Sequence, residues 1–252
     1  MVHFVGAGPG AADLITIRGK ALLEDADVII YAGSLVNPAL LEYAKPLCRV
    51  YNSAIMTLED VLGVICDAEE AGLTTVRLHT GDQSIYGAVR EQMDALDKKG
   101  ISYDSTPGVS SFCAAAAALD LEYTLPGVSQ SIIITRMAGR TPVPEKESIE
   151  SFAAHGAGMV IFLSTGMLED LSRRLTEGGY NKDTPAAIVF KASWPDEKKL
   201  VCTVGTLAKT AADENITKTA LVIVGNIVNP ERYSRSKLYD PAFGTEFREP
   251  EI

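Results

Sequence analysis

Cysteine is scarce in this chain of 252 residues, which has four, at positions 48, 66, 113 and 202. They stand far apart, with no C-x-x-C pair and no histidine close to them in sequence. Disulfide frameworks and structural zinc sites need paired or clustered cysteines, so we expect neither, and no metal site of the chain's own. We expect buried thiols in a reducing compartment.

Positive charge is also in short supply, because 23 Lys and Arg face 33 Asp and Glu, for a net charge of −10. Nucleic-acid binders usually carry a basic face, so the charge argues against that class. No segment approaches the roughly 20 apolar residues of a spanning helix, and residues 2–5 are too short for the apolar part of a signal peptide. We expect a cytoplasmic enzyme that binds neither nucleic acid nor membrane and meets anionic ligands with local arginines.

The first half of the chain alternates between short apolar runs and segments with helical spacing. The pattern predicts strands at 2–5, 27–31, 75–78 and 101–103, and helices at 14–23, 58–70, 88–98 and 113–119. Strands and helices that take turns indicate a mostly parallel sheet with helices on its faces.

The second half predicts a different sheet. We expect strands at 131–135, 159–163, 186–190, 200–204 and 220–224, and helices at 146–154, 168–177 and 206–213. The turn-like Trp194-Pro195-Asp196 joins two of these strands as a hairpin, which makes the sheet mixed. The sequence thus predicts two α/β domains, 1–122 and 123–230, followed by a polar tail at 231–252. We place the boundary at the turn residues from Tyr123 to Gly127.

The first strand is followed by the glycine turn Gly6-Ala7-Gly8-Pro9-Gly10. In a dinucleotide-binding G-x-G-x-x-G turn the third glycine comes one position later, and an acidic residue ends the second strand. Here Asp25 and Asp27 precede that strand. Pro9 lacks the N–H that such a turn aims at phosphate, which favours an uncharged or cationic ligand. A nicotinamide-dependent oxidoreductase remains the alternative from a different class.

Two further loops contain glycine and follow predicted strands: TGDQSIYG at 80–87 and TPGVSS at 106–111. Open α/β sheets bind ligands at the carboxyl ends of their strands. In this order and spacing, GAGPGAADLIT, TGDQSIYG and TPGVSS resemble the tetrapyrrole methylases, which are S-adenosylmethionine-dependent enzymes, and the resemblance extends to about residue 229. Gln83 stands where members of that family usually have proline.

Two stretches narrow the resemblance. YAGSLVNP at 31–38 and TRMAGRTPVPE at 135–145 are similar to those of methylases that act on C11 of precorrin-4. The resemblance therefore implies transfer of a methyl group from S-adenosylmethionine to C11 of precorrin-4 or cobalt-precorrin-4, in the corrin pathway to cobalamin, with S-adenosylhomocysteine as product. The alternatives are another carbon of a related intermediate, and a tetrapyrrole carrier without activity.

The resemblance also implies an active site in the cleft between the two domains, and a homodimer. The cofactor contacts that it implies are Pro9, Thr80, Gly81, Asp82, Ile85, Ser110, Ser111, Leu163, Ala192 and Ala220. A tetrapyrrole is edged with carboxylates, which guanidinium groups bind well, so we expect Arg136 and Arg140 to bind substrate. We assign no catalytic residue, and we expect His79, at the end of a buried strand, to be structural.

Overall fold

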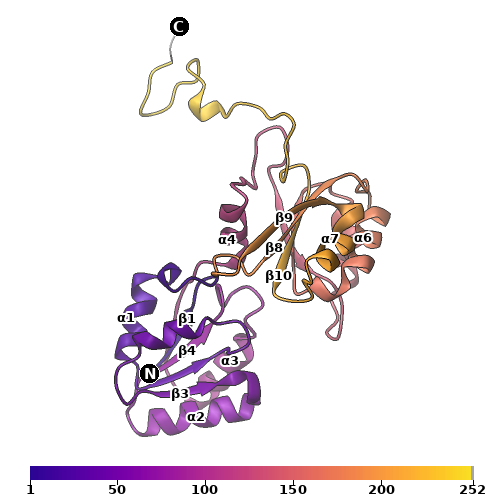
Figure 1. Cartoon of the computed structure of the whole chain (residues 1–252). Helices are drawn as coiled ribbons and strands as arrows, with labels where there is room; N and C mark the ends of the chain where they lie inside the picture. Colours follow the sequence, from indigo (N-terminus) through magenta and orange to yellow (C-terminus); the bar gives the residue numbers. More distant parts are fainter. Residues whose placement is uncertain (251–252) are drawn as a thin grey trace. The chain divides into compact units, whose positions relative to one another are not determined.

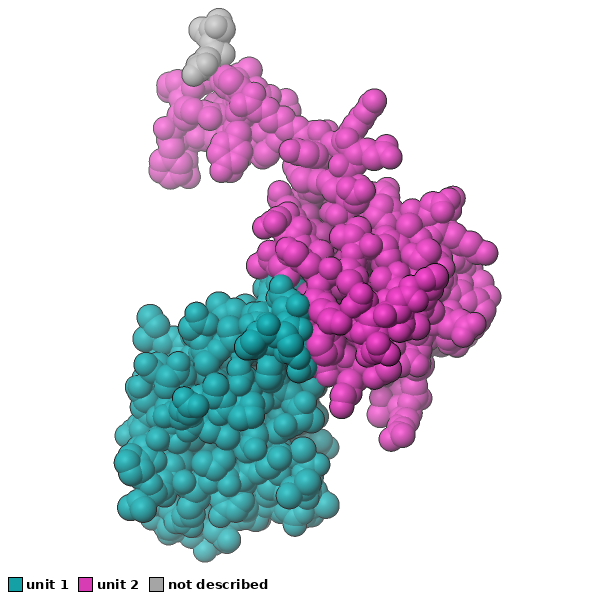
Figure 2. All heavy atoms as spheres, viewed as in Figure 1, with its two compact units in different colours: residues 1–115, 191–197 teal, residues 116–190, 198–252 magenta. Residues whose placement is uncertain are grey.

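The computed structural model describes residues 1–250, which form two compact units (Figure 2). Unit 1 contains Met1–Ala115 together with Lys191–Glu197, and unit 2 contains Ala116–Phe190 and the chain from Lys198 onward. The short segment 191–197 thus belongs to unit 1, although the strands on either side of it belong to unit 2. The domain boundaries expected from the sequence, after residues 122 and 230, stay a prediction.

Unit 1 is built on a parallel sheet of five strands in the order β3-β2-β4-β1-β5 (Figure 1). The strands are β1 (Val2–Gly6), β2 (Val28–Tyr31), β3 (Arg49–Asn52), β4 (Thr75–His79) and β5 (Tyr103–Thr106). Gly6 lies opposite His79, and Val5 lies opposite Thr106. The carboxyl ends of β4, β1 and β5 are therefore neighbours, and the loops that leave them start side by side.

Helices α1 (Ile17–Asp25), α2 (Leu58–Glu70) and α3 (Arg90–Lys99) cover this sheet. Helix α4 (Ser111–Ala118) follows β5 and crosses the division between the two units, which falls after Ala115. The start of α2 is fixed by a capping box, in which Thr57 and Asp60 satisfy each other's backbone N–H groups. The helix buries Val61 and Ile65 against Phe4 and Ile30 of the strands. Apolar burial of this kind, on both faces of the sheet, holds the strand ends in place.

Unit 2 has a mixed sheet in the order β6-β7-β10-β8-β9. Its strands are β6 (Ile132–Arg136), β7 (Gly158–Phe162), β8 (Pro185–Phe190), β9 (Lys198–Thr203) and β10 (Ala220–Val224), and its helices are α5 (Ile149–Ala153), α6 (Leu168–Glu177) and α7 (Leu207–Asp213). Strands β6 and β7 are parallel and the other pairs antiparallel, so the predicted hairpin of β8 and β9 is confirmed. The ends of β6, β7 and β8 and the start of β10 share one edge, because Arg136 lies opposite Phe162 and Ala220 opposite Phe190.

Short 3-10 helices connect several of these elements, at Ala12–Leu14, Pro38–Tyr43, Ser53–Ile55, Glu145–Glu147, Thr165–Met167, Val204–Thr206 and Lys237–Tyr239. The two α/β units confirm the expected fold class. Within residues 1–250, no helix combines the length and the apolar character that crossing a bilayer requires.

Two expectations are wrong. The sequence patterns missed β3, an edge strand whose Arg49 and Val50 are exposed, so that no alternation of buried residues marks it. The cysteines are free but not buried: three are half-buried, and Cys113 is exposed on the solvent side of α4. The alanines that follow it, Ala114 and Ala115, make the buried contacts of that helix.

Candidate functional site

The three glycine-bearing loops of unit 1 meet through their backbones. We call residues 6–10, 79–87 and 106–111 the three-loop cluster. Gly8 and Gly81 exchange two hydrogen bonds, with N···O distances of 3.2 and 2.8 Å, and the Ala7 N–H donates to the His79 carbonyl over 2.7 Å. Asp82 joins the third loop by accepting a hydrogen bond of 2.8 Å from the Gly108 N–H. Segments far apart in sequence thus form one surface at the carboxyl ends of β1, β4 and β5.

Contact between the loops explains why glycine is needed there. A Cβ atom on Gly6 would lie 2.5 Å from the Gly108 nitrogen and 2.7 Å from the Gly81 oxygen, and one on Gly108 would lie 2.2 Å from the same oxygen. Gly8 and Gly81 also have left-handed φ angles of 79° and 59°, which favour glycine. The glycine pattern is therefore set by loop-to-loop packing and not by the close approach of a phosphate.

Asp82 joins the second and third loops. Its carboxylate accepts hydrogen bonds from the N–H and the hydroxyl of Ser84 and from the Gly108 N–H. Partial burial raises the pKa of Asp82, but these hydrogen bonds together outweigh burial and hold the pKa below its usual value. Both carboxylate oxygens are in use, so the side chain is an ionised structural link.

Gln83, which stands where the family has proline, makes a second link. It is 7% exposed, and its Nε2 donates to the Thr106 carbonyl over 3.1 Å. The amide thus ties the second loop to the end of β5. Proline has no side-chain donor, so the departure from the family pattern adds a hydrogen bond that proline cannot make.

The segment 191–197 packs on the glycine turn. The Trp194 indole N–H donates to the Pro9 carbonyl over 3.1 Å, and the Ala11 N–H donates to the Ser193 hydroxyl over 3.0 Å. A Cβ on Gly10 would lie 2.1 Å from Trp194 Cδ1. Sequence reasoning missed this role of Trp194, because no local pattern relates residues 185 positions apart.

Two carbonyls of the glycine turn accept hydrogen bonds from side chains. Pro9 accepts from Trp194, and Gly10 accepts from the Asn37 amide over 2.8 Å. Asn37 belongs to the 31–38 stretch, as does Leu35, whose carbonyl accepts from the Thr80 hydroxyl over 3.4 Å. The structure therefore places Pro9, Thr80 and Ala192 around one turn. Ala192 is 6% exposed, and its carbonyl oxygen would lie 2.9 Å from a Cβ atom on Gly10.

His79 lies beneath the cluster as a structural residue. It is 4% exposed and stacks on Phe4, with ring centroids 6.2 Å apart. Burial, together with the nearby positive charge of Arg77, lowers the pKa of His79 to about 3. Burial also lowers the pKa of Arg77 to about 10, and this guanidinium donates to Gln92 and to the Ile30 carbonyl. His79 is therefore neutral near pH 7 and is no general acid.

In unit 2, Leu163 and Ala220 come together at the sheet edge defined above. Leu163 follows β7 with a left-handed φ of 53° and is 61% exposed. A left-handed φ costs a leucine roughly 1–2 kcal/mol. Ala220 is buried, and its carbonyl accepts from the Thr165 hydroxyl over 3.1 Å.

The two predicted substrate arginines lie beside this edge, and their surroundings differ. Arg136 ends β6, and its guanidinium donates to the carbonyls of Met137, Thr141 and Pro142 over 3.1, 3.1 and 2.7 Å. Arg140 is exposed, and within residues 1–250 it forms no hydrogen bond or ion pair. Residues 137–142, which follow Arg136 and include Arg140, form what we call the arginine loop.

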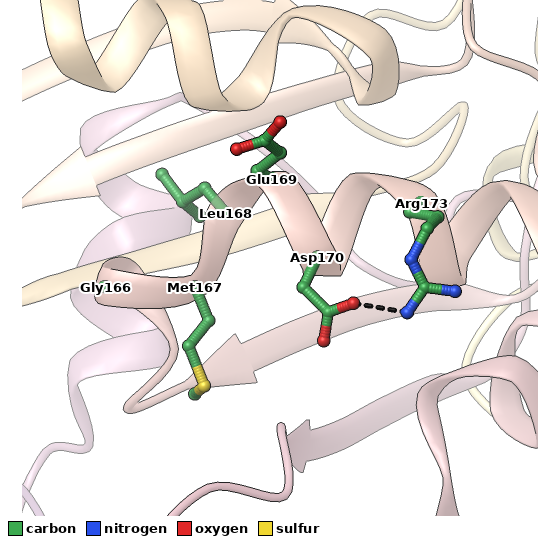
Figure 3. Close-up of a pocket in the computed structure, with 6 residues that line it drawn as sticks. All are labelled: Gly166, Met167, Leu168, Glu169, Asp170 and Arg173. Atoms are coloured by element: carbon green, nitrogen blue, oxygen red, sulfur yellow. Dashed lines mark hydrogen bonds and ion pairs between the residues drawn. The ribbon is translucent and has the colours of Figure 1, made fainter.

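A pocket of about 630 Å³ lies at the start of α6, lined by Gly166, Met167, Leu168, Glu169, Asp170 and Arg173 (Figure 3). Asp170 forms an ion pair with Arg173, as the dashed line in Figure 3 marks. The Met167 side chain reaches the arginine loop, since a Cβ on Gly139 would lie 3.6 Å from its methyl carbon. The pocket thus adjoins the loop that carries Arg140.

The geometry does not support a nicotinamide site on the glycine turn. Asp27 lies before the start of β2, at the amino end of the parallel strands, where it pairs with Lys45 over 2.8 Å and accepts from the Thr74 N–H. The hydrogen bond with Lys45 is the main cause of a lowered pKa at Asp27. The ribose of a dinucleotide binds at the opposite, carboxyl ends. Among residues 1–250 no group of three or more His, Cys, Asp or Glu could hold a metal ion.

Comparison with known families agrees with the resemblance in the loops. A family model of tetrapyrrole (corrin/porphyrin) methylases matches residues 1–208, well over half of the chain. The chain therefore belongs to the tetrapyrrole methylases.

Three known proteins show how near the relationship is. A cobalt-precorrin-4 C(11)-methyltransferase of Methanocaldococcus jannaschii is 53% identical over 98% of this chain and 95% of its own. The X-ray structure of a cobalamin biosynthetic enzyme, cobalt precorrin-4 methyltransferase, matches with a TM-score of 0.89 and 41% identity, over 91% of this chain and 96% of that chain. A uroporphyrin-III C-methyl transferase from Thermus thermophilus, complexed with S-adenyl homocysteine, matches with a TM-score of 0.73 and 26% identity, over 90% and 93% of the two chains.

Proposed function

We propose that this chain is a methyltransferase that moves the methyl group of S-adenosylmethionine to C11 of precorrin-4, in its metal-free or its cobalt form, on the corrin pathway to cobalamin. The observation that carries the proposal is the 53% identity with a C(11)-methyltransferase over nearly the whole of both chains. The matched 98% of the chain includes the three-loop cluster and the arginine loop, where we expect cofactor and substrate to bind.

The proposed cofactor contacts suit a ligand that is partly apolar and carries a sulfonium in place of a phosphate. Leu163 offers an exposed apolar side chain, and Ile85 is half-buried beside the exposed Tyr86. Pro9 would contact the ligand through its ring, because its carbonyl already accepts from Trp194. The full set that we propose is Pro9, Thr80, Gly81, Asp82, Ile85, Ser110, Ser111, Leu163, Ala192 and Ala220.

The contribution of the chain to the reaction is orientation. S-adenosylmethionine supplies the electrophilic methyl group of its sulfonium. Loops held by backbone contacts, as at Gly8 and Gly81, keep their shape without a ligand, and correct orientation of two reactants contributes up to roughly 7–11 kcal/mol. We assign no catalytic base, because His79 is neutral and buried and Asp82 has both oxygens engaged.

Binding and turnover test the proposal together. We expect calorimetry to show binding of S-adenosylhomocysteine and no binding of NADH. We expect incubation with S-adenosylmethionine and either precorrin-4 or cobalt-precorrin-4 to release S-adenosylhomocysteine and add one methyl group to the tetrapyrrole. Tight binding of NADH alone would support the oxidoreductase. Tetrapyrrole binding without any S-adenosylhomocysteine release would support the carrier.

The oligomeric state of the chain and its location in the cell complete the proposal. We expect the chain to form a homodimer, which sedimentation of the purified protein at several concentrations tests. We also expect it to lie in the cytoplasm, because its four free cysteines suit a reducing compartment, and cell fractionation tests this. A monomer at all concentrations, or recovery in the membrane fraction, would contradict these expectations.

A further inference from the structure

The arginine loop is held from one side by the residue that precedes it. Arg136 donates to the Met137, Thr141 and Pro142 carbonyls with N···O distances of 3.1, 3.1 and 2.7 Å. A guanidinium has five N–H groups. Three hydrogen bonds leave from its two terminal nitrogens, so the end-on pair of N–H groups that grips a carboxylate is taken up within the loop. The loop carbonyls thus use most of the donors of Arg136, and Nε–H and one N–H of Nη2 are left.

The other side of the loop is fixed from β7. The Met137 N–H donates to the Ser164 hydroxyl over 2.9 Å, and that hydroxyl donates to the Phe162 carbonyl over 2.7 Å. Met137 and Ser164 are 3% and 1% exposed. At the tip, the Gly139 N–H donates to the Thr141 carbonyl over 3.2 Å, which closes a tight turn. Both limbs of the loop are thus held by hydrogen bonds, although residues 138–142 are exposed.

Arg140 lies at that tip, with a guanidinium that none of residues 1–250 engages by a hydrogen bond or an ion pair. The chain has a net charge of −10, so an anionic ligand needs a local positive group. A free planar guanidinium on a held turn can bind a carboxylate through two N–H groups.

We propose that Arg136 is a positioning residue, which holds the arginine loop in the shape from which Arg140 binds a carboxylate of the substrate. The inference rests on the proposed function for the identity of that substrate, a tetrapyrrole edged with carboxylates. It separates two arginines that the sequence presents as equivalent: Arg136 acts on the loop, and Arg140 acts on the ligand.

Trypsin tests the holding role without any substrate. Cleavage after Arg140 needs the loop to open, so we expect Arg136→Gln to raise the cleavage rate at this bond at least tenfold, measured by mass spectrometry of the fragment. Arg136→Lys, which keeps the charge but lacks the planar fork, should give an intermediate rate, and it serves if the glutamine variant does not fold. The matched control is Arg248→Gln, because Arg248 also donates to three carbonyls, those of Leu238, Asp240 and Phe243. Wild-type cleavage rates in both Arg136 variants would overturn the proposal.

Kinetics of the full chain test the division of roles. Loss of a charge-assisted hydrogen bond corresponds to a change of about 10- to 100-fold, so Arg140→Gln should raise the KM for the tetrapyrrole by that factor and leave kcat within about twofold. Arg136→Gln should raise the KM as well, but add nothing to Arg140→Gln in the double variant. Arg232→Gln makes the same charge change in a different pocket, which lies at the start of β8 and the end of β9, and it should leave the KM unchanged.

The outcomes separate the two proposals. Additive effects of Arg136→Gln and Arg140→Gln on the KM would show that Arg136 binds substrate itself, which overturns the inference. If the wild type transfers no methyl group to either form of precorrin-4, the proposed function fails and the role of Arg140 fails with it. The tryptic rates would still decide whether Arg136 holds the loop.

Discussion

Replacing Gly10 by alanine tests whether the glycine turn is held by Trp194. The new Cβ would lie 2.1 Å from Trp194 Cδ1 and 2.3 Å from Nε1, where carbon contacts normally measure about 3.5–4.0 Å. The backbone oxygen of Ala192 is 2.9 Å away and cannot give easily. The indole must therefore move by more than about 1 Å and lose its hydrogen bond to Pro9.

The cost has two parts. Overpacking of a filled site costs about 1–3 kcal/mol, and loss of the hydrogen bond from the indole to the Pro9 carbonyl costs about 0.5–1.5 kcal/mol. We expect Gly10→Ala to lower the free energy of unfolding by about 2–4 kcal/mol. The displaced indole should also become more exposed to water.

Urea unfolding followed by fluorescence measures both effects, because Trp194 is the only tryptophan of the chain. The emission of folded Gly10→Ala should shift to longer wavelength. Gly63→Ala is the matched control: nothing lies within 4 Å of its Cβ position inside α2, so alanine there should stabilise by about 0.5–1 kcal/mol. A Gly10→Ala protein with wild-type stability and emission would refute the packing of Trp194 on the turn.

Three further variants separate structure from binding. Asp82→Asn should lower the free energy of unfolding by about 1 kcal/mol at pH 7, since it weakens the acceptor for Ser84 and Gly108. Because the pKa of Asp82 is lowered in the folded chain, the difference from wild type should vanish as pH falls through that pKa. A difference that stays constant with pH would count against the link between the loops. His79 has a pKa of about 3 in the folded chain and about 6.5 in the unfolded chain, so lowering the pH protonates the unfolded chain first. The wild type should therefore lose about 2 kcal/mol of stability between pH 7 and pH 5 relative to His79→Leu. Equal pH dependence of the two proteins in chemical unfolding would contradict a buried neutral imidazole. Leu163→Gly should change the free energy of unfolding by less than about 1 kcal/mol, because glycine relieves the left-handed φ of 53°. The same variant should raise the dissociation constant of S-adenosylhomocysteine about tenfold in calorimetry. Leu47→Gly, at a residue with φ of 71° and 99% exposure, is its control, and equal cofactor affinity in the two variants would remove Leu163 from the site.

Much of the fold follows from local patterns. The predicted helices at 58–70 and 168–177 and the predicted strand at 220–224 agree with α2, α6 and β10 residue for residue. These segments either repeat their apolar residues at helical spacing or are buried throughout, as β10 is. Two elements were harder to predict. Strand β3 lies at the sheet edge and lacks a buried face. Helix α5 is only Ile149–Ala153 within the predicted 146–154, because a 3-10 helix takes up Glu145–Glu147.

The candidate site was predicted in its parts but not in its contacts. Loop composition indicated where the chain turns, yet the reason for Gly6 and Gly108 lies in each other's backbones, about a hundred residues apart. The same limit applies to Arg136, whose residue type suggested a ligand for a carboxylate. Its guanidinium binds carbonyls up to six residues away, a local contact that depends on the path of the loop and not on the sequence pattern.

The position of the transferred methyl group tests the central claim most directly. S-adenosylmethionine labelled with ¹³C in its methyl group, incubated with the chain and each form of precorrin-4, gives a product whose labelled carbon can be located by NMR. We predict a single labelled methyl group, attached to C11. A label on any other ring carbon, or no label in the tetrapyrrole with either form, would contradict the account.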